Sequence, residues 1–180
     1  MKGLASIKSI TTLLASLAFA FGCPVPVSGQ ASSKLSQEAD VSAKPVEGFQ
    51  LTARLEKEEI QACQPVALVV TLRNLSKDTL AFPESAPYRD YRLVVKDSNG
   101  REVPLTRYGK AIKDTEGEFR LVVTDLPAHS ELRATLLVNR YYDMTVTDTY
   151  SVSVRRDVLL KSRDRVVEVL SNSVRVKITD

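Results

Sequence analysis

Apolar and polar residues alternate with a period of two along much of the chain from Phe49 onward. In residues 49–55 the side chains of Phe49, Leu51 and Leu55 share one face, and residues 66–73 repeat the pattern. A β-strand points successive side chains to opposite faces of a sheet. The period therefore predicts strands that bury one face.

Further short apolar runs follow, separated by turn-forming residues. Asn74–Asp78 predicts a turn, Pro83 the end of a strand, and Asn99–Gly100 a tight hairpin, because these two residues tolerate positive φ angles. Pro104 places the returning strand at a sheet edge, and residues 56–61 predict a strand end and a loop. The predicted strands are 49–55, 66–73, 79–82, 91–96, 101–105, 119–124, 132–139, 149–156, 166–170 and 174–179.

This succession of short strands, without a convincing amphipathic helix, predicts an all-β fold, a two-sheet antiparallel sandwich over residues 49–180. Tyr150 is predicted to pack its ring in the core and to hydrogen-bond the backbone through its hydroxyl. The predicted core consists of Leu51, Leu55, Leu68, Val70, Leu72, Leu93, Val95, Val122, Leu136, Val138, Tyr150, Val152, Val154, Val174, Val176 and Ile178.

The N-terminal 29 residues have the composition of a bacterial secretory signal peptide. Lys2 and Lys8 precede the uncharged apolar run 10–21, whose 12 residues are too few for a membrane-spanning helix of about 20. Residues 30–48 are small and polar and predict a disordered tether. The expected location is therefore secreted, periplasmic or at the cell surface.

The position at which the leader is cleaved decides the fate of the two cysteines of the chain. Cleavage after Ala20 leaves Cys23 and Cys63 able to pair, whereas cleavage after Gly29 leaves Cys63 alone. Residues 20–23 also resemble a bacterial lipoprotein processing box, which makes Cys23 a lipidation candidate. A membrane association is expected only in that third case.

Charge and motif content argue against several functional classes. Of the 25 Lys and Arg, two lie in the leader, which leaves 23 against 22 Asp and Glu. Interspersed charges of near-zero sum do not predict a nucleic-acid partner. His129, in a loop, has no ordered nucleophile motif around it, so no catalytic residue and no enzyme activity is predicted.

No metal or cofactor is predicted either. Transition metals need several His or Cys ligands at set spacing, and the glycines form no phosphate-binding run. Asp125, Asp143 and Asp148 were weighed as calcium ligands, but solvated loop acids are the preferred interpretation because no calcium-binding loop motif is present.

Tyr and Arg occur together at three places, and this pair is enriched at interface hot spots. For the third place, residues 140–143, a structural role is favoured, with Arg and Asp paired. The first two lie on and beside one predicted hairpin and predict a protein-binding patch formed by Tyr88, Arg89, Tyr91, Arg92, Arg107 and Tyr108.

Six segments along the chain form a recognisable series of strand and turn motifs: Val69–Asn74, Tyr91–Gly100, Leu126–Ser130, Tyr142–Thr145, Asp148–Val152 and Ser171–Val176. Through these segments the chain from Phe49 to Asp180 resembles immunoglobulin-like domains of bacterial exported proteins. It is similar to intracellular proteinase inhibitor-type domains and to noncatalytic domains of secreted metallopeptidases, with Ala128-His129 and Asp148 where those patterns have glycine.

The resemblance implies an immunoglobulin-like sandwich but specifies function poorly, since such sandwiches carry function in their loops. The favoured function is a noncatalytic binding or assembly module with a protein partner. The alternative is a proteinase inhibitor, for which residues 111–118 are the candidate protease-binding loop.

Export is testable directly. Residues 1–48 fused to a reporter that is active only outside the cytoplasm are expected to give signal, and retention in the cytoplasm would contradict the prediction. The intact mass of the mature protein then distinguishes cleavage after Ala20, cleavage after Gly29 and lipidation at Cys23.

Overall fold

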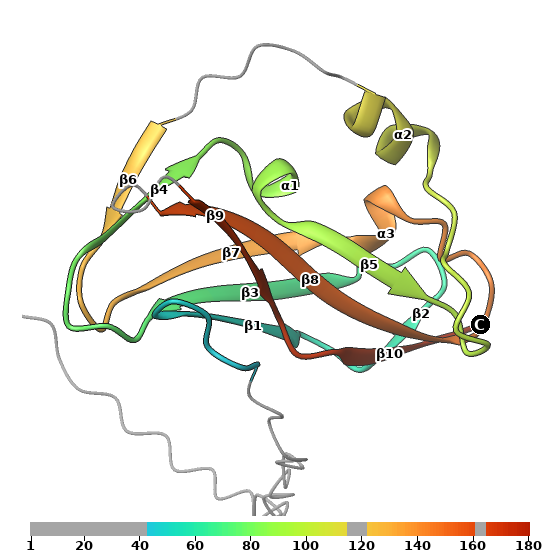
Figure 1. Cartoon of the computed structure of the whole chain (residues 1–180). Helices are drawn as coiled ribbons and strands as arrows, with labels where there is room; N and C mark the ends of the chain where they lie inside the picture. The colour runs from blue at the N-terminus through green and yellow to red at the C-terminus, as the bar shows by residue number, and fades with distance from the viewer. Residues whose placement is uncertain (1–42, 115–121, 161–164) are drawn as a thin grey trace, which may run out of the picture. The chain divides into compact units, whose positions relative to one another are not determined.

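A computed structural model of the protein describes residues 43–114, 122–160 and 165–180 (Figure 1). These residues belong to one compact unit, Gln37–Asp180. The predicted signal peptide, Cys23 and most of the tether lie outside the described residues, so they stay predictions.

The first sheet contains β1 (Phe49–Leu55), β3 (Ala67–Asn74) and β7 (Glu131–Leu137), in the order β1-β3-β7. All its pairings are antiparallel. Along β1 and β3 alternate side chains are buried, as the period of two predicts. The predicted strand 132–139 ends early, because the chain turns into a helix after Leu137.

The second sheet is built around β8 (Thr149–Leu160). The order is β2 (Glu59–Gln61), β10 (Val174–Thr179), β8 and β5 (Arg92–Lys96), and β9 (Arg165–Leu170) pairs with the far half of β8. The pairing of β2 with β10 is parallel. This corrects both the predicted loop at 56–61 and the all-antiparallel expectation.

A third, two-stranded sheet joins β4 (Leu80–Glu84) to β6 (Val122–Leu126). Pro83 lies within β4 rather than after it, which a two-stranded sheet with free edges tolerates. Val122 was predicted in the core, but it pairs with Glu84 at the end of this sheet and is 57% exposed. Val122 is exposed because of its place at the end of this sheet, which the alternation of side chains along the strand does not reveal.

Three short helices replace segments that the sequence predicts as strand or loop. They are α1 (Pro87–Asp90), α2 (Arg107–Asp114) and α3 (Val138–Tyr141). The predicted strand 101–105 is absent, and only the isolated bridges Lys96↔Glu102 and Leu105↔Tyr142 lie there. The hairpin before it is present, but only Gly100 has a positive φ, of 77°.

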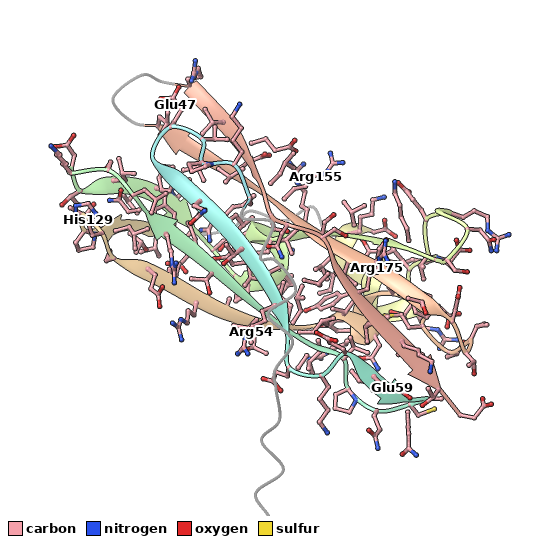
Figure 2. All side chains as sticks on the ribbon, turned by 90° about the horizontal axis from the view of Figure 1, so that it is seen from below. Glu47, Arg54, Glu59, His129, Arg155 and Arg175 are labelled. Atoms are coloured by element: carbon pink, nitrogen blue, oxygen red, sulfur yellow. The ribbon has the colours of Figure 1, made fainter. Side chains whose placement is uncertain are left out.

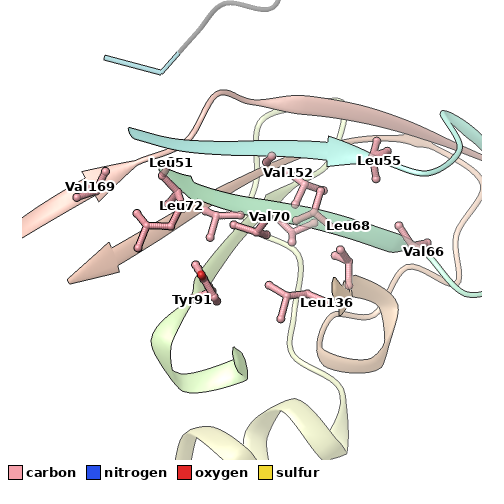
Figure 3. Packing of buried hydrophobic residues seen from close by; sticks show 14 of the residues in the cluster. Leu51, Leu55, Val66, Leu68, Val70, Leu72, Tyr91, Leu136, Val152 and Val169 are labelled. Atoms are coloured by element: carbon pink, nitrogen blue, oxygen red, sulfur yellow. The ribbon is translucent and has the colours of Figure 1, made fainter. Parts of the chain in front are cut away.

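One hydrophobic cluster draws its members from all three sheets (Figure 3). Leu51 and Leu72 of the first sheet contribute to it together with Val152 of the second and Phe82 of the third. Thirteen of the sixteen predicted core residues are buried, while Leu93 and Val174 are half-buried and Val122 is exposed. The domain is therefore mostly β, with several antiparallel sheets around a common core.

Asparagine side chains tie strands to loops where the ladders stop. Asn74 is fully buried, and its amide donates to the carbonyls of Asp78, Leu126 and Pro127. Asn172, between β9 and β10, accepts from the Ala53 N–H (2.8 Å) and donates to the Ala53 carbonyl (3.0 Å). Unpaired buried backbone groups are costly, so these amides complete the strands that they touch.

The core also holds one buried charge. Arg156 follows Val152 and Val154 on the inward face of β8 and is 1% exposed. Its guanidinium lies 4.7 Å from the centre of the Phe82 ring and 4.5 Å from that of Tyr91. Asp90, the last residue of α1, places a carboxylate oxygen 3.9 Å from Nη2.

Hydrogen bonding around Arg156 is incomplete within the described residues. Nη1 and Nη2 of Arg156 and the hydroxyl of Tyr91 are buried without a hydrogen-bond partner there. Asp90 instead accepts from the backbone N–H and hydroxyl of Ser85. Burial raises the pKa of Tyr91, and the neighbouring positive charge of Arg156 opposes that rise. The charge is thus held by two ring faces and one carboxylate.

Tyr150 has the geometry that the sequence predicts: it is buried, and its hydroxyl donates to the carbonyl of Val146 (2.8 Å). Tyr150→Phe is expected to lower the free energy of unfolding by about 1 kcal/mol, through loss of that hydrogen bond. Tyr150→Ala removes the ring too and is expected to cost about 3 kcal/mol or more. Urea denaturation measures both, and an alanine variant as stable as wild type would contradict the packing role.

The Arg156–Asp90 pair gives a second stability prediction. Asp90→Asn keeps an acceptor for Ser85 but leaves the guanidinium charge uncompensated, at an expected cost of about 3 kcal/mol in the free energy of unfolding. Arg156→Met keeps much of the volume but leaves the Asp90 carboxylate, whose side chain is 10% exposed, without its counter-charge, so it is also expected to be destabilising. In the double variant neither charge remains, and the loss should be smaller than the sum of the two single losses. Additive losses in that double variant would show that the two residues do not interact.

Candidate functional site

The six residues predicted to form a binding patch lie on or between three elements. Tyr88 and Arg89 are on α1, Arg107 and Tyr108 are on α2, Arg92 begins β5, and Tyr91 lies between α1 and β5. The structure brings some of them together and separates others.

Tyr91 does not belong to a contact surface, because it is 3% exposed and its ring faces Arg156 in the core. Its neighbour Arg92 points to the opposite side and is exposed. The sequence could have indicated this, since Tyr91 shares its strand face with Val95, which is also buried. The prediction that Tyr91 is a binding residue is therefore corrected.

Arg92 is engaged in ion pairs at the surface of the second sheet. It lies 2.8 Å from Asp157 and 3.3 Å from Glu168. Arg89 and Arg92 line a shared open hollow of about 340 Å³ with Pro83, Asp90 and Asp157. Because cations and carboxylates alternate around it, the hollow has no marked charge preference.

Tyr88 and Tyr108 take part in a second, more ordered arrangement with two residues of α3. The rings of Tyr108 and Tyr141 are 5.5 Å apart, and the Arg140 guanidinium lies 4.2 Å from the centre of the Tyr108 ring. The guanidinium of Arg89 lies 5.6 Å from the Tyr88 ring centre. We name this set, Tyr88, Arg89, Tyr108, Arg140 and Tyr141, the tyrosine–arginine cluster.

Tyr88 lies within electrostatic reach of Tyr141. Burial raises the pKa of Tyr141, Tyr108 and Tyr88 raise it further, and Arg140 opposes the rise. The hydroxyl of Tyr141 therefore stays protonated at neutral pH and remains a hydrogen-bond donor.

Backbone contacts fix α2 against α3. Thr106 caps α2, since its hydroxyl accepts from the Gly109 N–H (3.0 Å), and the same residue donates through its backbone to the Tyr141 carbonyl (2.8 Å). A Cβ at Gly109 would lie 2.2 Å from that carbonyl oxygen. Glycine is thus required for the close approach of the two helices, which lie near each other in Figure 1.

The sequence predicts a structural role for residues 140–143, and only part of this segment has one. Tyr142 is structural, because its hydroxyl donates to the Leu93 carbonyl (2.6 Å). Arg140 is exposed and Tyr141 half-buried, both in contact with Tyr108. The predicted pairing of Arg140 with Asp143 is not found, since the Asp143 carboxylate accepts from the Thr145 hydroxyl instead. A sequence signal was available in the repeated Tyr-Arg pairing of 88–89, 107–108 and 140–141.

The described ranges, 43–114, 122–160 and 165–180, contain no group of three or more His, Cys, Asp or Glu placed to hold a metal ion. Asp125 and Asp148 serve local roles: Asp125 lies in β6, and Asp148 has its pKa lowered by hydrogen bonds from Ser98 and Thr149. His129 lies exposed in the loop before β7, with φ 58° (Figure 2). A left-handed backbone thus persists where the resembling domains have glycine.

Two further features bear on location and on the inhibitor alternative. No helix in the described part of the chain is long and apolar enough to cross a membrane. Of the candidate protease-binding loop 111–118, residues 111–114 belong to α2, and the remainder lies outside the described residues. Cys63, also exposed, makes no disulfide within those residues.

Comparison with known proteins gives a fold-level likeness only. No protein-family model and no curated protein sequence matches the chain. Among solved structures, the CARDB domain of a Pyrococcus furiosus protein is 13% identical, with a TM-score of 0.39 over 77% of this chain and 95% of that one. The C-terminal domain of wzt is 10% identical, with a TM-score of 0.44 over 77% and 81%.

A structural-genomics target of unstated function is 11% identical, with a TM-score of 0.45 over 75% of this chain and 90% of that one. The CARDB and wzt domains are β-rich. These likenesses indicate nothing about the activity of the chain.

Proposed function

We propose that this protein is an exported, noncatalytic immunoglobulin-like module that binds another protein through the tyrosine–arginine cluster. The observation that carries the proposal is the packing of Tyr108 on α2 against Tyr141 and Arg140 on α3, with a second Tyr-Arg contact, Tyr88 and Arg89, on α1. The helices interrupt the strands at these points, and sheet formation alone does not call for them.

The cluster has the physical properties of an interface hot spot. Tyr and Arg offer large contact areas with a polar end, and they dominate measured interface energetics. Here the rings of Tyr108 and Tyr141 are in contact. The backbone of α2 is fixed against that of α3 by the hydrogen bond from Thr106 to the Tyr141 carbonyl and by the close approach at Gly109. A surface ordered before binding loses less conformational entropy when a partner docks.

The remaining parts of the proposal have separate support. The antiparallel orders β1-β3-β7 and β10-β8-β5, together with the hydrogen bond from Tyr150 to the backbone four residues upstream, support the immunoglobulin-like arrangement. The leader pattern of residues 1–29 supports export. The inhibitor alternative retains only the sequence resemblance in its favour.

Affinity capture from the exported protein fraction tests the proposed surface. Wild type is compared with Tyr88→Ala/Tyr108→Ala/Arg140→Ala, and a partner should fall at least about tenfold in yield, as expected when hot-spot side chains are truncated. The matched control, Leu75→Ala/Val146→Ala/Arg175→Ala, also removes two exposed apolar side chains and one arginine, and should retain the partner.

Photo-crosslinking from position 108 should attach to the same partner, which ties the captured protein to the cluster. Equal retention by all three proteins would remove the cluster from the proposal. Inhibition of a serine protease or metalloprotease at nanomolar concentration would replace the module with the inhibitor.

A further inference from the structure

The three helices that build the tyrosine–arginine cluster carry an excess of positive charge. Their sequences contain five Lys and Arg against two Asp. One of the two, Asp90, accepts hydrogen bonds from Ser85 and lies beside Arg156, and the other, Asp114, ends α2. Near neutrality of the whole domain therefore conceals a local cationic surface.

Three of these cations, Arg107, Lys110 and Arg140, are weakly compensated within the described residues. Arg73 pairs with Glu131, Arg92 with Asp157, and Arg101 with Asp97, so several arginines on the sheets are neutralised. In the same described ranges Arg107, Lys110 and Arg140 form no ion pair. Arg140 is instead stacked on Tyr108.

The geometry of α2 presents these charges beside the rings. Arg107 and Lys110 are three residues apart, hence on one face of the helix, and both are exposed. Gly109 marks the opposite face, which approaches the Tyr141 carbonyl. A ligand lying along α2 therefore meets cations on the outward side and the Tyr108 ring on its flank.

We infer that the segment that docks here is an acidic peptide, one in which Asp or Glu residues alternate with aromatic residues, supplied by a partner protein. The inference rests on the function proposed above. Carboxylates would pair with Arg107, Lys110 and Arg140, and the apolar side chains would pack against Tyr108 and Tyr141.

A nucleic acid also presents negative charge and stacking groups, but the surface suits it less well. Binding a phosphate backbone needs a continuous stripe of uncompensated cations along the protein. Here the α2 charges are followed by Asp114, and the neighbouring hollow alternates Arg89 and Arg92 with Asp90 and Asp157. A small group of cations flanked by acidic residues is better suited in size to a short acidic peptide than to a phosphate backbone.

Fluorescence anisotropy with the purified full chain tests the inference. The probe is a labelled ten-residue peptide in which Phe follows every two Glu, and its counterpart carries Gln in place of Glu. We expect the acidic peptide to bind at least about tenfold more tightly, and to weaken as salt rises from 50 to 300 mM, because exposed charges are screened.

Two charge-matched variants locate the binding. Arg107→Gln/Arg140→Gln is expected to weaken binding about tenfold or more, since both cations would contact carboxylates. Arg54→Gln/Arg175→Gln removes two exposed cations from β1 and β10, both labelled in Figure 2, and should change affinity less than about twofold. Circular dichroism confirms that all proteins are folded.

Four results would overturn the inference: equal binding of the Gln peptide, equal weakening by both variants, tighter binding of a single-stranded oligothymidylate, or binding that appears only in Glu116→Gln/Glu118→Gln. The last would assign the cationic surface to acids of this chain. If capture identifies a cluster-dependent partner while the acidic peptide fails, the module stands and only its acidic specificity is lost.

Discussion

The buried guanidinium of Arg156 organises the part of the molecule from which the candidate site projects. It lies between the rings of Phe82 and Tyr91, which belong to different segments, and it faces the carboxylate of Asp90. Phe82 anchors β4, while Asp90 and Tyr91 form the junction between α1 and β5. A single side chain on β8 thus sets the position of the helix that carries Tyr88 and Arg89. A hydrophobic side chain would fill the same volume, but it would not orient α1 through a carboxylate.

Asparagine amides perform the equivalent task where strands meet loops. Asn172 satisfies both backbone groups of Ala53 on β1, and Asn139 accepts from the Val66 N–H while donating to the Gln64 carbonyl. Asn74 donates to the carbonyls of Leu126 and Pro127, where β6 leads toward β7, and its side-chain oxygen accepts from Ser76. An amide offers a donor and an acceptor together, so it continues a ladder where no strand is available. These residues hold the three sheets around one core, although the longest ladders lie within sheets.

The candidate surface is separate from this framework in composition as well as in position. The framework relies on aliphatic residues and inward-facing amides, whereas the surface consists of stacked tyrosines and cations on three short helices. Its rigidity comes from backbone contacts of Thr106 and Gly109, which do not depend on the exposed side chains. The exposed cations Arg107, Lys110 and Arg140 can therefore be changed with little effect on folding, a property typical of binding loops on β-scaffolds.

Much of the fold could be predicted from the sequence, because strand faces follow from a local period of two. That period identified β1, β3, β8 and β10, most of the core and the role of Tyr150. Compartment and the improbability of catalysis were likewise inferred from composition and motif spacing, and both stay predictions.

Only tertiary structure decided the rest. Helices of four residues such as α1 and α3 are too short to show a period, and the parity that buries Val154 also buries Arg156, whose partners are distant in the chain. For the same reason the Tyr and Arg residues were grouped by sequence proximity, whereas packing moved Tyr91 into the core and brought Tyr141 and Arg140 to Tyr108. Local pattern determines which residues can be buried, but only the meeting of remote segments determines which charges and rings become neighbours.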